Sequence, residues 1–228
     1  METSLHRELK ALYAGDDGQV EVRLGRYRID VVRGDLLIEV QHAGLSSIRD
    51  KVRRLCGEAP VLVVKPVVAR RRLVTRDKPG GRVKSRRWSP KRGRLVDLFH
   101  DFVHFTKAFP HERLAVEAPL VEVEEHRVPG HGRRRRWRRR DHVVVDQKLL
   151  GVLSTVRFET AADLWRLVEG PLPLEFDTAE LATALDTPRW VAQRAAYCLH
   201  AMGAAERVGK RRGAWLYQRR ASSLADAA

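Results

Sequence analysis

The spacing of apolar residues predicts a regular succession of elements in roughly the first 70 residues. Leucines at Leu5, Leu9 and Leu12 are three and four positions apart, as they are on one face of a helix. Downstream, apolar and polar residues alternate as in half-buried strands. The elements expected are a helix at residues 3–13, strands at 19–24, 26–32 and 36–41, a helix at 47–56 and an apolar strand at 60–68.

A tight hairpin is expected where Arg33-Gly34-Asp35 separates the second and third strands, because glycine tolerates the positive φ of such turns. A two-residue turn would place Asp30 on the same sheet face as Glu39, whereas a three-residue turn would place it on the opposite face. Two carboxylates on one face among apolar neighbours call for a neutralising cation, and oxygen ligands suit Mg²⁺ or Mn²⁺. The simpler alternative is that both acids face water on an exposed hairpin.

Two side chains on the flanking helices are expected to point toward the hairpin acids. Glu8 falls inside the apolar stripe of the first helix. An acid on that buried face would not be exposed to water, so it calls for another role. Lys51 lies within the stripe of the second helix, formed by Ile48, Val52 and Leu55. The lysine could reach the carboxylates or extend its ammonium into solvent.

The order of these acids resembles the PD-(D/E)xK nuclease superfamily. The resemblance rests on a helix acid, Glu8, then Asp30, then Glu39-Val40-Gln41. It is strongest for the branch that carries glutamine in place of the motif lysine, to which CoiA-like competence proteins belong. The chain has Ile29 where the family has proline. The match covers roughly the first 70 residues and implies a restriction-endonuclease-like α-β-β-β-α-β core.

The resemblance also implies an activity, the Mg²⁺-dependent hydrolysis of phosphodiester bonds in DNA. Asp30 and Glu39 would hold the metal ion. Glu8 would bind an outer-shell water or a second metal ion. Gln41 or Lys51 would orient the attacking water, and the metal would lower the pKa of that water.

The most informative feature of the composition is the net charge. The 228 residues carry a net charge of +15, which points to a polyanion, with nucleic acid ahead of an anionic membrane. No apolar run is long enough to span a bilayer, and the N-terminus has no signal-peptide pattern, so a cytoplasmic protein is expected. Cys56 and Cys198 lie far apart in helical stripes and are predicted to be buried thiols.

Two arginine-rich segments are expected to contact a phosphate backbone. Residues 69–94 are predicted to form a long basic loop, with Trp88 free to stack on a base or sugar. Residues 129–141 are predicted to form an arginine-rich hairpin that a bound polyanion would order. The alternative is a solvated, non-specific tether. The residues predicted to bind nucleic acid here are Arg86, Arg87, Trp88, Arg133, Arg134, Arg135, Arg136, Trp137 and Arg138.

Two weaker candidate sites compete with the hairpin acids. His100 and His104 are four residues apart, as in zinc proteases, but no third ligand is obvious, and surface or core histidines are the favoured interpretation. Asp146-Gln147-Lys148 matches the D-x-K half of the nuclease motif. Glu122 or Glu124 could supply the partner acid. No upstream helix acid accompanies that motif, so it ranks second.

The C-terminal pattern is three helices followed by a basic hairpin, and it is similar to the winged-helix family. Helices are expected at 160–168, 177–185 and 188–202, and strands on either side of 209–213. The third helix would be the recognition helix, although many winged helices mediate only protein contacts. The residues expected to face DNA are Arg189, Trp190, Gln193 and Arg194 on the helix and Lys210, Arg211 and Arg212 on the wing.

The sequence therefore predicts an α/β (α+β) protein with a nuclease-like domain at 1–152, a smaller winged helix-turn-helix domain at 153–220 and a disordered tail at 221–228. The favoured function is a metal-dependent endonuclease acting on double-stranded DNA. The alternatives are a non-catalytic DNA-binding regulator or architectural protein on an inactive nuclease fold, and, more weakly, an RNA-binding factor. The sequence does not decide between a monomer and a homodimer, because many such nucleases are dimers but no dimer motif is visible here.

Overall fold

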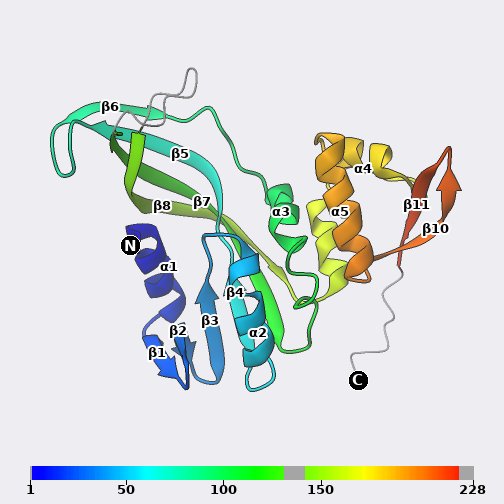
Figure 1. Ribbon diagram of the computed structural model, residues 1–228, viewed down its shortest axis with the longest axis horizontal. Coiled ribbons are helices and arrows are strands. Elements are labelled where there is room, and N and C mark those ends of the chain that lie inside the picture. Colours follow the sequence, from blue (N-terminus) through cyan, green and yellow to red (C-terminus); the bar gives the residue numbers. More distant parts are fainter. Residues whose placement is uncertain (1, 131–141, 221–228) are drawn as a thin grey trace. The chain divides into compact units, whose positions relative to one another are not determined.

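The structure is a computed structural model, and it describes residues 2–130 and 142–220 (Figure 1). The chain divides into two compact units. The first unit comprises residues 1–42, 64–94 and 118–156, and the second comprises 43–63, 95–117 and 157–228. Segments 43–63 and 95–117, which the sequence pattern places in an N-terminal domain, therefore belong to the second unit.

The fold class predicted from the sequence is confirmed, because the protein combines a large mixed sheet with several helices (Figure 1). Among the described residues the larger sheet has eight strands in the order β1-β2-β3-β4-β7-β5-β6, with β8 paired to β7. The strands are β1 (Gln19–Leu24), β2 (Tyr27–Arg33), β3 (Leu36–Val40), β4 (Val61–Val64), β5 (Val67–Arg76), β6 (Val83–Trp88), β7 (Leu114–Pro129) and β8 (His142–Phe158).

The first unit opens with a helix and an antiparallel meander. Helix α1 (Ser4–Ala14) begins after Thr3, whose hydroxyl accepts a hydrogen bond from the backbone N–H of His6. It ends at Gly15, which has a φ of 58° that glycine adopts without steric cost. Strands β1, β2 and β3 then pair in sequence, and Ile29, Val31 and Ile38 are fully buried among them.

The apolar run at 60–68 is two strands rather than one. Strand β4 ends at Val64, and β5 begins at Val67. Pro66 lies between them and has no backbone N–H with which to continue a strand ladder.

The prediction of a long basic loop at 69–94 is wrong, because most of that segment is a β-hairpin. Strand β5 runs antiparallel to β6 and parallel to β7. Arg70 pairs with Glu122 at 2.9 Å and Arg72 with Glu124 at 2.7 Å, so acids on β7 neutralise cations on β5. The partner acids lie about 50 residues away in sequence, which is why local charge density suggested a loop.

The second unit holds η1 (Leu45–Ser47), α2 (Arg49–Leu55), η2 (Leu95–Leu98) and α3 (Phe99–Phe102). Although residues 95–109 are strongly apolar, they do not form one long helix; the segment forms one short 3₁₀ turn, four α-helical residues and further turns. Its phenylalanines anchor it instead. Phe99, Phe102, Phe105 and Phe109 are all fully buried, and the Phe102 ring stacks on Phe109 at a centroid distance of 5.8 Å.

The C-terminal part of the second unit contains η3 (Ala161–Leu167), β9 (Glu175–Phe176), α4 (Thr178–Ala184), α5 (Arg189–Ala201), β10 (Ala205–Arg211) and β11 (Ala214–Arg219). Its strands form a sheet in the order β10-β11-β9. Strand β9 was not predicted from the sequence, because its two residues are too few to show an alternating pattern. Both strands expected on either side of 209–213 are present, and β10 continues into that segment as far as Arg211.

Both cysteines are buried thiols, as predicted. Burial raises the pKa of the Cys56 thiol to about 11 and that of the Cys198 thiol to about 12. In the described part of the chain, no helix combines the length and the apolar character that a membrane crossing requires.

Candidate functional site

The hairpin acids lie on the same face of adjacent strands. Val31 pairs with Ile38 and Arg33 with Leu36, so the turn between β2 and β3 has two residues. This register, continued by one position, sets Asp30 opposite Glu39, and directly opposed residues share a sheet face. The Glu39 side chain is buried, with 4% of the residue exposed, whereas the Asp30 side chain keeps 22% of its surface accessible.

Asp30 is held by two donors. Its Oδ2 accepts a hydrogen bond from the backbone N–H of Val40 at 2.8 Å, and its Oδ1 lies 3.4 Å from Nε2 of His6. Burial favours the neutral acid and is the largest single influence on its pKa. The hydrogen bonds from His6 and Val40, with the charges of His6 and Lys10, outweigh burial and hold the pKa of Asp30 below its ordinary value.

The helix residue beside Asp30 is His6, and the prediction that Glu8 lies on the buried face of α1 is wrong. Glu8 is exposed, and its Oε2 accepts a hydrogen bond from the backbone N–H of Leu149 on β8 at 2.6 Å. The buried face of α1 is centred on Leu5, Leu9 and Lys10, while Leu12 is 55% exposed. The stripe is therefore rotated away from Glu8, and the leucine spacing alone misplaced it.

Gln41 and the residues around it continue the site from β3. The backbone N–H of Gln41 donates to the carbonyl of Val64 at 2.8 Å, which fixes the chain just beyond the strand. Lys65 is 7% exposed, and its Nζ donates to the carbonyl of His42 at 3.1 Å. Partial desolvation of the His42 ring lowers its pKa, and the nearby cations Lys65 and Arg71 lower it further. His42 and Lys65, which follow the E-x-Q segment and β4, were not among the residues predicted for the site.

Lys51 lies on α2 in the second unit and is half-buried. Its expected role as a substitute for the motif lysine stays a prediction.

The two hairpin carboxylates fit a cation that keeps part of its own water shell. Among the described residues there is no cluster of three or more His, Cys, Asp or Glu side chains arranged to hold a metal ion. Mg²⁺ often binds through one or two carboxylates and retains several waters, and Asp30 with Glu39 supplies that donor set. These residues fit Mg²⁺ or Mn²⁺ better than a closed zinc site.

The second-ranked motif has a structural role at the start of α1. Asp146 accepts hydrogen bonds from the backbone N–H of Ser4 at 2.8 Å and from its hydroxyl at 2.7 Å. Gln147 is buried, and its side-chain amide donates to Glu125 at 2.8 Å. Asp146 and Glu8 therefore join α1 to β8, while Gln147 joins β8 to β7.

Strand β6 presents the basic residues predicted at 86–88. All six of its residues are exposed, Arg86 and Arg87 among them. Trp88 is engaged within the protein, because the guanidinium of Arg70 lies 4.3 Å from the centroid of its ring. The indole therefore already carries a cation on one face.

Helix α5 presents the stripe predicted for a recognition helix, since Arg189, Trp190, Gln193 and Arg194 are all exposed. His100 explains part of its arrangement. The imidazole stacks on Trp190 at 5.1 Å, and its Nδ1 lies 2.8 Å from Nη1 of Arg194. The histidine that suggested a zinc motif thus packs against this stripe. Sequence analysis missed Tyr197, which continues the stripe and is 48% exposed.

The β10–β11 hairpin carries the three cations that were predicted for a wing. Arg211 pairs with Glu180 at 2.5 Å, which ties the wing to the first turn of α4. Arg212 lies at the exposed tip, with a φ of 50°. Trp215, which was not among the predicted residues, has two cations over its ring: the guanidinium of Arg207 lies 4.6 Å and the ammonium of Lys210 4.4 Å from the ring centroid. The remaining predicted residues, Arg133, Arg134, Arg135, Arg136, Trp137 and Arg138, lie outside the described residues.

Comparison with known proteins assigns the chain to a family. A model of the family described as "Domain of unknown function (DUF8091)" matches residues 3–159. The chain belongs to this family. A protein of Treponema pallidum (strain Nichols) described as uncharacterized is 30% identical over 182 residues, covering 79% of this chain and 71% of the relative. No solved structure matches the chain.

The part of the chain that matches the DUF8091 family includes the whole acidic hairpin. It contains α1 and strands β1 to β8, with Asp30 and Glu39. It ends at residue 159, before η3, so α5 and the wing lie outside it.

Proposed function

We propose that the protein is a metal-dependent nuclease acting on DNA. The observation that carries the proposal is the register of the β2–β3 hairpin, which pairs Val31 with Ile38. Continued by one position, this register brings Asp30 and Glu39 to the same sheet face. The order α1-β1-β2-β3-α2-β4 also agrees with the core that the nuclease resemblance implies. The net charge of +15 fits a polyanionic substrate.

The roles of the residues follow from their surroundings. Asp30 and Glu39 would hold Mg²⁺. When bound, the ion would stabilise negative charge on the scissile phosphate and lower the pKa of a water molecule. His6 positions the Asp30 carboxylate through its contact with Oδ1, and the Val40 N–H restrains Oδ2. Gln41 is the side chain we expect to orient a water. Glu8 has no part in this site, because its carboxylate binds β8.

DNA would be positioned by exposed cations outside the acidic site. Strand β6 offers Arg86 and Arg87, while α5 offers Arg189 and Arg194. Such contacts to phosphates fix orientation and carry little sequence information. A substrate bound mainly in this way would be cut with weak sequence preference.

The test is a cleavage assay on supercoiled plasmid, linear duplex and single-stranded DNA, with Mg²⁺, Mn²⁺ or EDTA. Asp30→Asn and Glu39→Gln should each reduce metal-dependent cleavage by roughly 100-fold or more, because several kcal/mol of charge stabilisation depends on the metal. Asp35→Asn is the matched control, since Asp35 is exposed in the turn of the same hairpin. It should cut like the wild type.

A second readout does not require turnover. Mg²⁺ should raise the melting temperature of the wild type and of Asp35→Asn, but not that of Asp30→Asn. Cleavage that survives in both acid variants would place the chemistry elsewhere and contradict the proposal.

A second candidate function is a non-catalytic DNA-binding protein built on the same fold. Its support is Gln41 in the place of the motif lysine, together with the exposed α5 stripe and wing. Under this alternative, no cleavage occurs with any metal, while binding to DNA is tight and sensitive to salt.

A further inference from the structure

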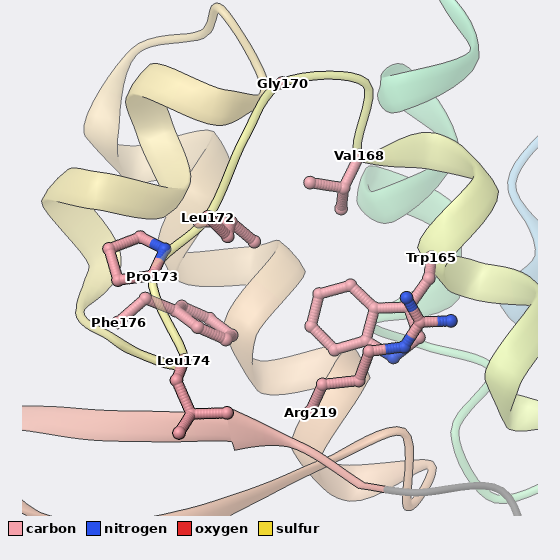
Figure 2. A pocket seen from close by; sticks show the side chains of 8 residues that line it. All are labelled: Trp165, Val168, Gly170, Leu172, Pro173, Leu174, Phe176 and Arg219. Carbon is pink, nitrogen blue, oxygen red and sulfur yellow. The ribbon is translucent and has the colours of Figure 1, made fainter.

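A cavity in the C-terminal part of the second unit lies apart from every residue named in the proposed nuclease site. It has a volume of about 320 Å³ and is formed by η3, the segment 168–174 that precedes β9, and the end of β11. Figure 2 shows the side chains of Trp165, Phe176 and Leu172 around the open space. Its volume lies at the lower end of the range typical of small-molecule sites.

The floor of the cavity is aromatic. Trp165 is 8% exposed and Phe176 is 1% exposed, and their rings meet edge to face at 5.9 Å. The indole Nε1 donates to the carbonyl of Ala204 at 3.1 Å, so the polar atom of Trp165 is already used. The part of the ring that remains for a ligand is apolar, which favours a flat hydrocarbon group.

One cation lies at the edge of this apolar space. The guanidinium of Arg219 lies 5.3 Å from the centroid of the Trp165 ring (Figure 2). Among the described residues, no carboxylate lies within ion-pair distance of Arg219, whereas the adjacent Arg220 pairs with Glu206 at 3.8 Å. A guanidinium held over an aromatic face still presents N–H groups at its edge, and these match both oxygens of a carboxylate.

The wall opposite Trp165 is held in place by the backbone. The N–H of Gly170 donates to the carbonyl of Ala184 at 3.0 Å. A Cβ at position 170 would lie 2.7 Å from that carbonyl oxygen, so glycine permits this close approach. The segment that carries Leu172 and Pro173 is therefore held against the end of α4 by a backbone hydrogen bond.

We propose that this cavity binds a small aromatic carboxylate. The ring of the ligand would pack between Leu172 and the pair formed by Trp165 and Phe176, and its carboxylate would accept hydrogen bonds from Arg219. This assignment rests on the apolar walls and the single cation, and it does not depend on nuclease activity.

The test is isothermal titration calorimetry of the full chain with 1-naphthoate and with the neutral analogue 1-naphthalenemethanol. Arg219→Gln should weaken naphthoate binding roughly 10- to 100-fold, the range that a charge-assisted hydrogen bond supplies. It should leave binding of the alcohol unchanged. Leu172→Trp, which fills the cavity, should abolish binding of both.

The matched control is Arg207→Gln. Arg207 also lies over an indole, that of Trp215, on the same small sheet, but it does not line the cavity. It should leave naphthoate binding unchanged. Equal weakening in Arg207→Gln and Arg219→Gln would mean that naphthoate responds only to the positive surface. Binding that persists in Leu172→Trp, or no naphthoate binding by the wild type at millimolar concentration, would also overturn the assignment.

Discussion

At the scale of single residues, the charge on Asp30 depends on neighbours from two directions. Val40 belongs to the paired strand, and His6 comes from α1. Together they overcome the burial that would otherwise keep the carboxyl neutral. A carboxylate that is ionised before any cation arrives is the form a metal ligand must take.

The lowered pKa of Asp30 predicts how its contribution to stability varies with pH. Because the folded-state pKa lies below the ordinary value of 3.8, ionised Asp30 stabilises the fold above that value. The contribution is lost as pH falls through the folded-state pKa. Asp30→Asn should lower the free energy of unfolding by roughly 1 kcal/mol at pH 7, and this difference should shrink below pH 3.8.

Urea unfolding of both proteins between pH 7 and pH 3 measures the difference directly. Other titrating groups are common to the two proteins and cancel. A difference that stays constant or grows as pH falls would contradict the assignment of partners to Asp30.

At the scale of elements, α4 shows how a short helix is stabilised at its start. The Asp177 carboxylate accepts hydrogen bonds from the N–H groups of Ala179 at 2.7 Å and Glu180 at 3.0 Å. Glu180 in turn accepts from the Asp177 N–H at 2.8 Å, which completes a capping box. Seven residues gain little from helix propensity alone, so these bonds matter more here than in a long helix.

Removing the cap should therefore have a measurable cost. We expect Asp177→Ala to lower the free energy of unfolding by about 1 kcal/mol, because two backbone N–H groups lose their acceptor. Asp16→Ala is the control: Asp16 is exposed in the turn after α1, and its loss should change stability by less than about 0.5 kcal/mol. Thermal melts followed by circular dichroism would compare the two variants, and equal effects would argue against the cap.

At the scale of the whole molecule, the charge of +15 is the feature that favours the proposed polyanionic partner. Many arginines are neutralised internally, as Arg70 and Arg72 are by acids on β7. Cations such as Arg189 and Arg212 are exposed and carry no acidic partner among the described ion pairs. DNA binding should therefore depend on a subset of the cations rather than on total charge.

The salt dependence of DNA binding separates these two cases. We expect Arg189→Gln and Arg212→Gln each to reduce the slope of log K against log salt by about 1, the value for one lost phosphate contact. Arg26→Gln removes the same charge from the exposed turn between β1 and β2 and should leave the slope unchanged. Fluorescence anisotropy with a labelled duplex at several salt concentrations measures the slopes, and equal reductions in all three variants would contradict a localised interface.

Local signals were sufficient for much of the fold and for part of the candidate site. The two-residue turn at Gly34 followed from a glycine between alternating strands, and it put Asp30 and Glu39 on one face. The helix expected at 177–185 is α4, and its start is set by the capping pair Asp177 and Glu180. These features depend on residues close in sequence, whose geometry is set by short-range sterics and hydrogen bonds.

Long-range pairing decided the rest. Strand β5 could not be told from a basic loop until β7 brought its acids alongside. The rotation of α1 placed His6 beside Asp30 and Glu8 beside β8, although the leucine spacing alone had predicted that Glu8 would face the hairpin acids.

The sequence by itself determined the fold class, the hairpin and the excess of positive charge, because each is a property of composition or of neighbouring residues. Tertiary structure alone decided which helix residue meets Asp30, which arginines stay exposed, and that Trp165 and Arg219 border one cavity. Trp165 and Arg219 stand more than 50 residues apart, and only packing brings residues so distant together.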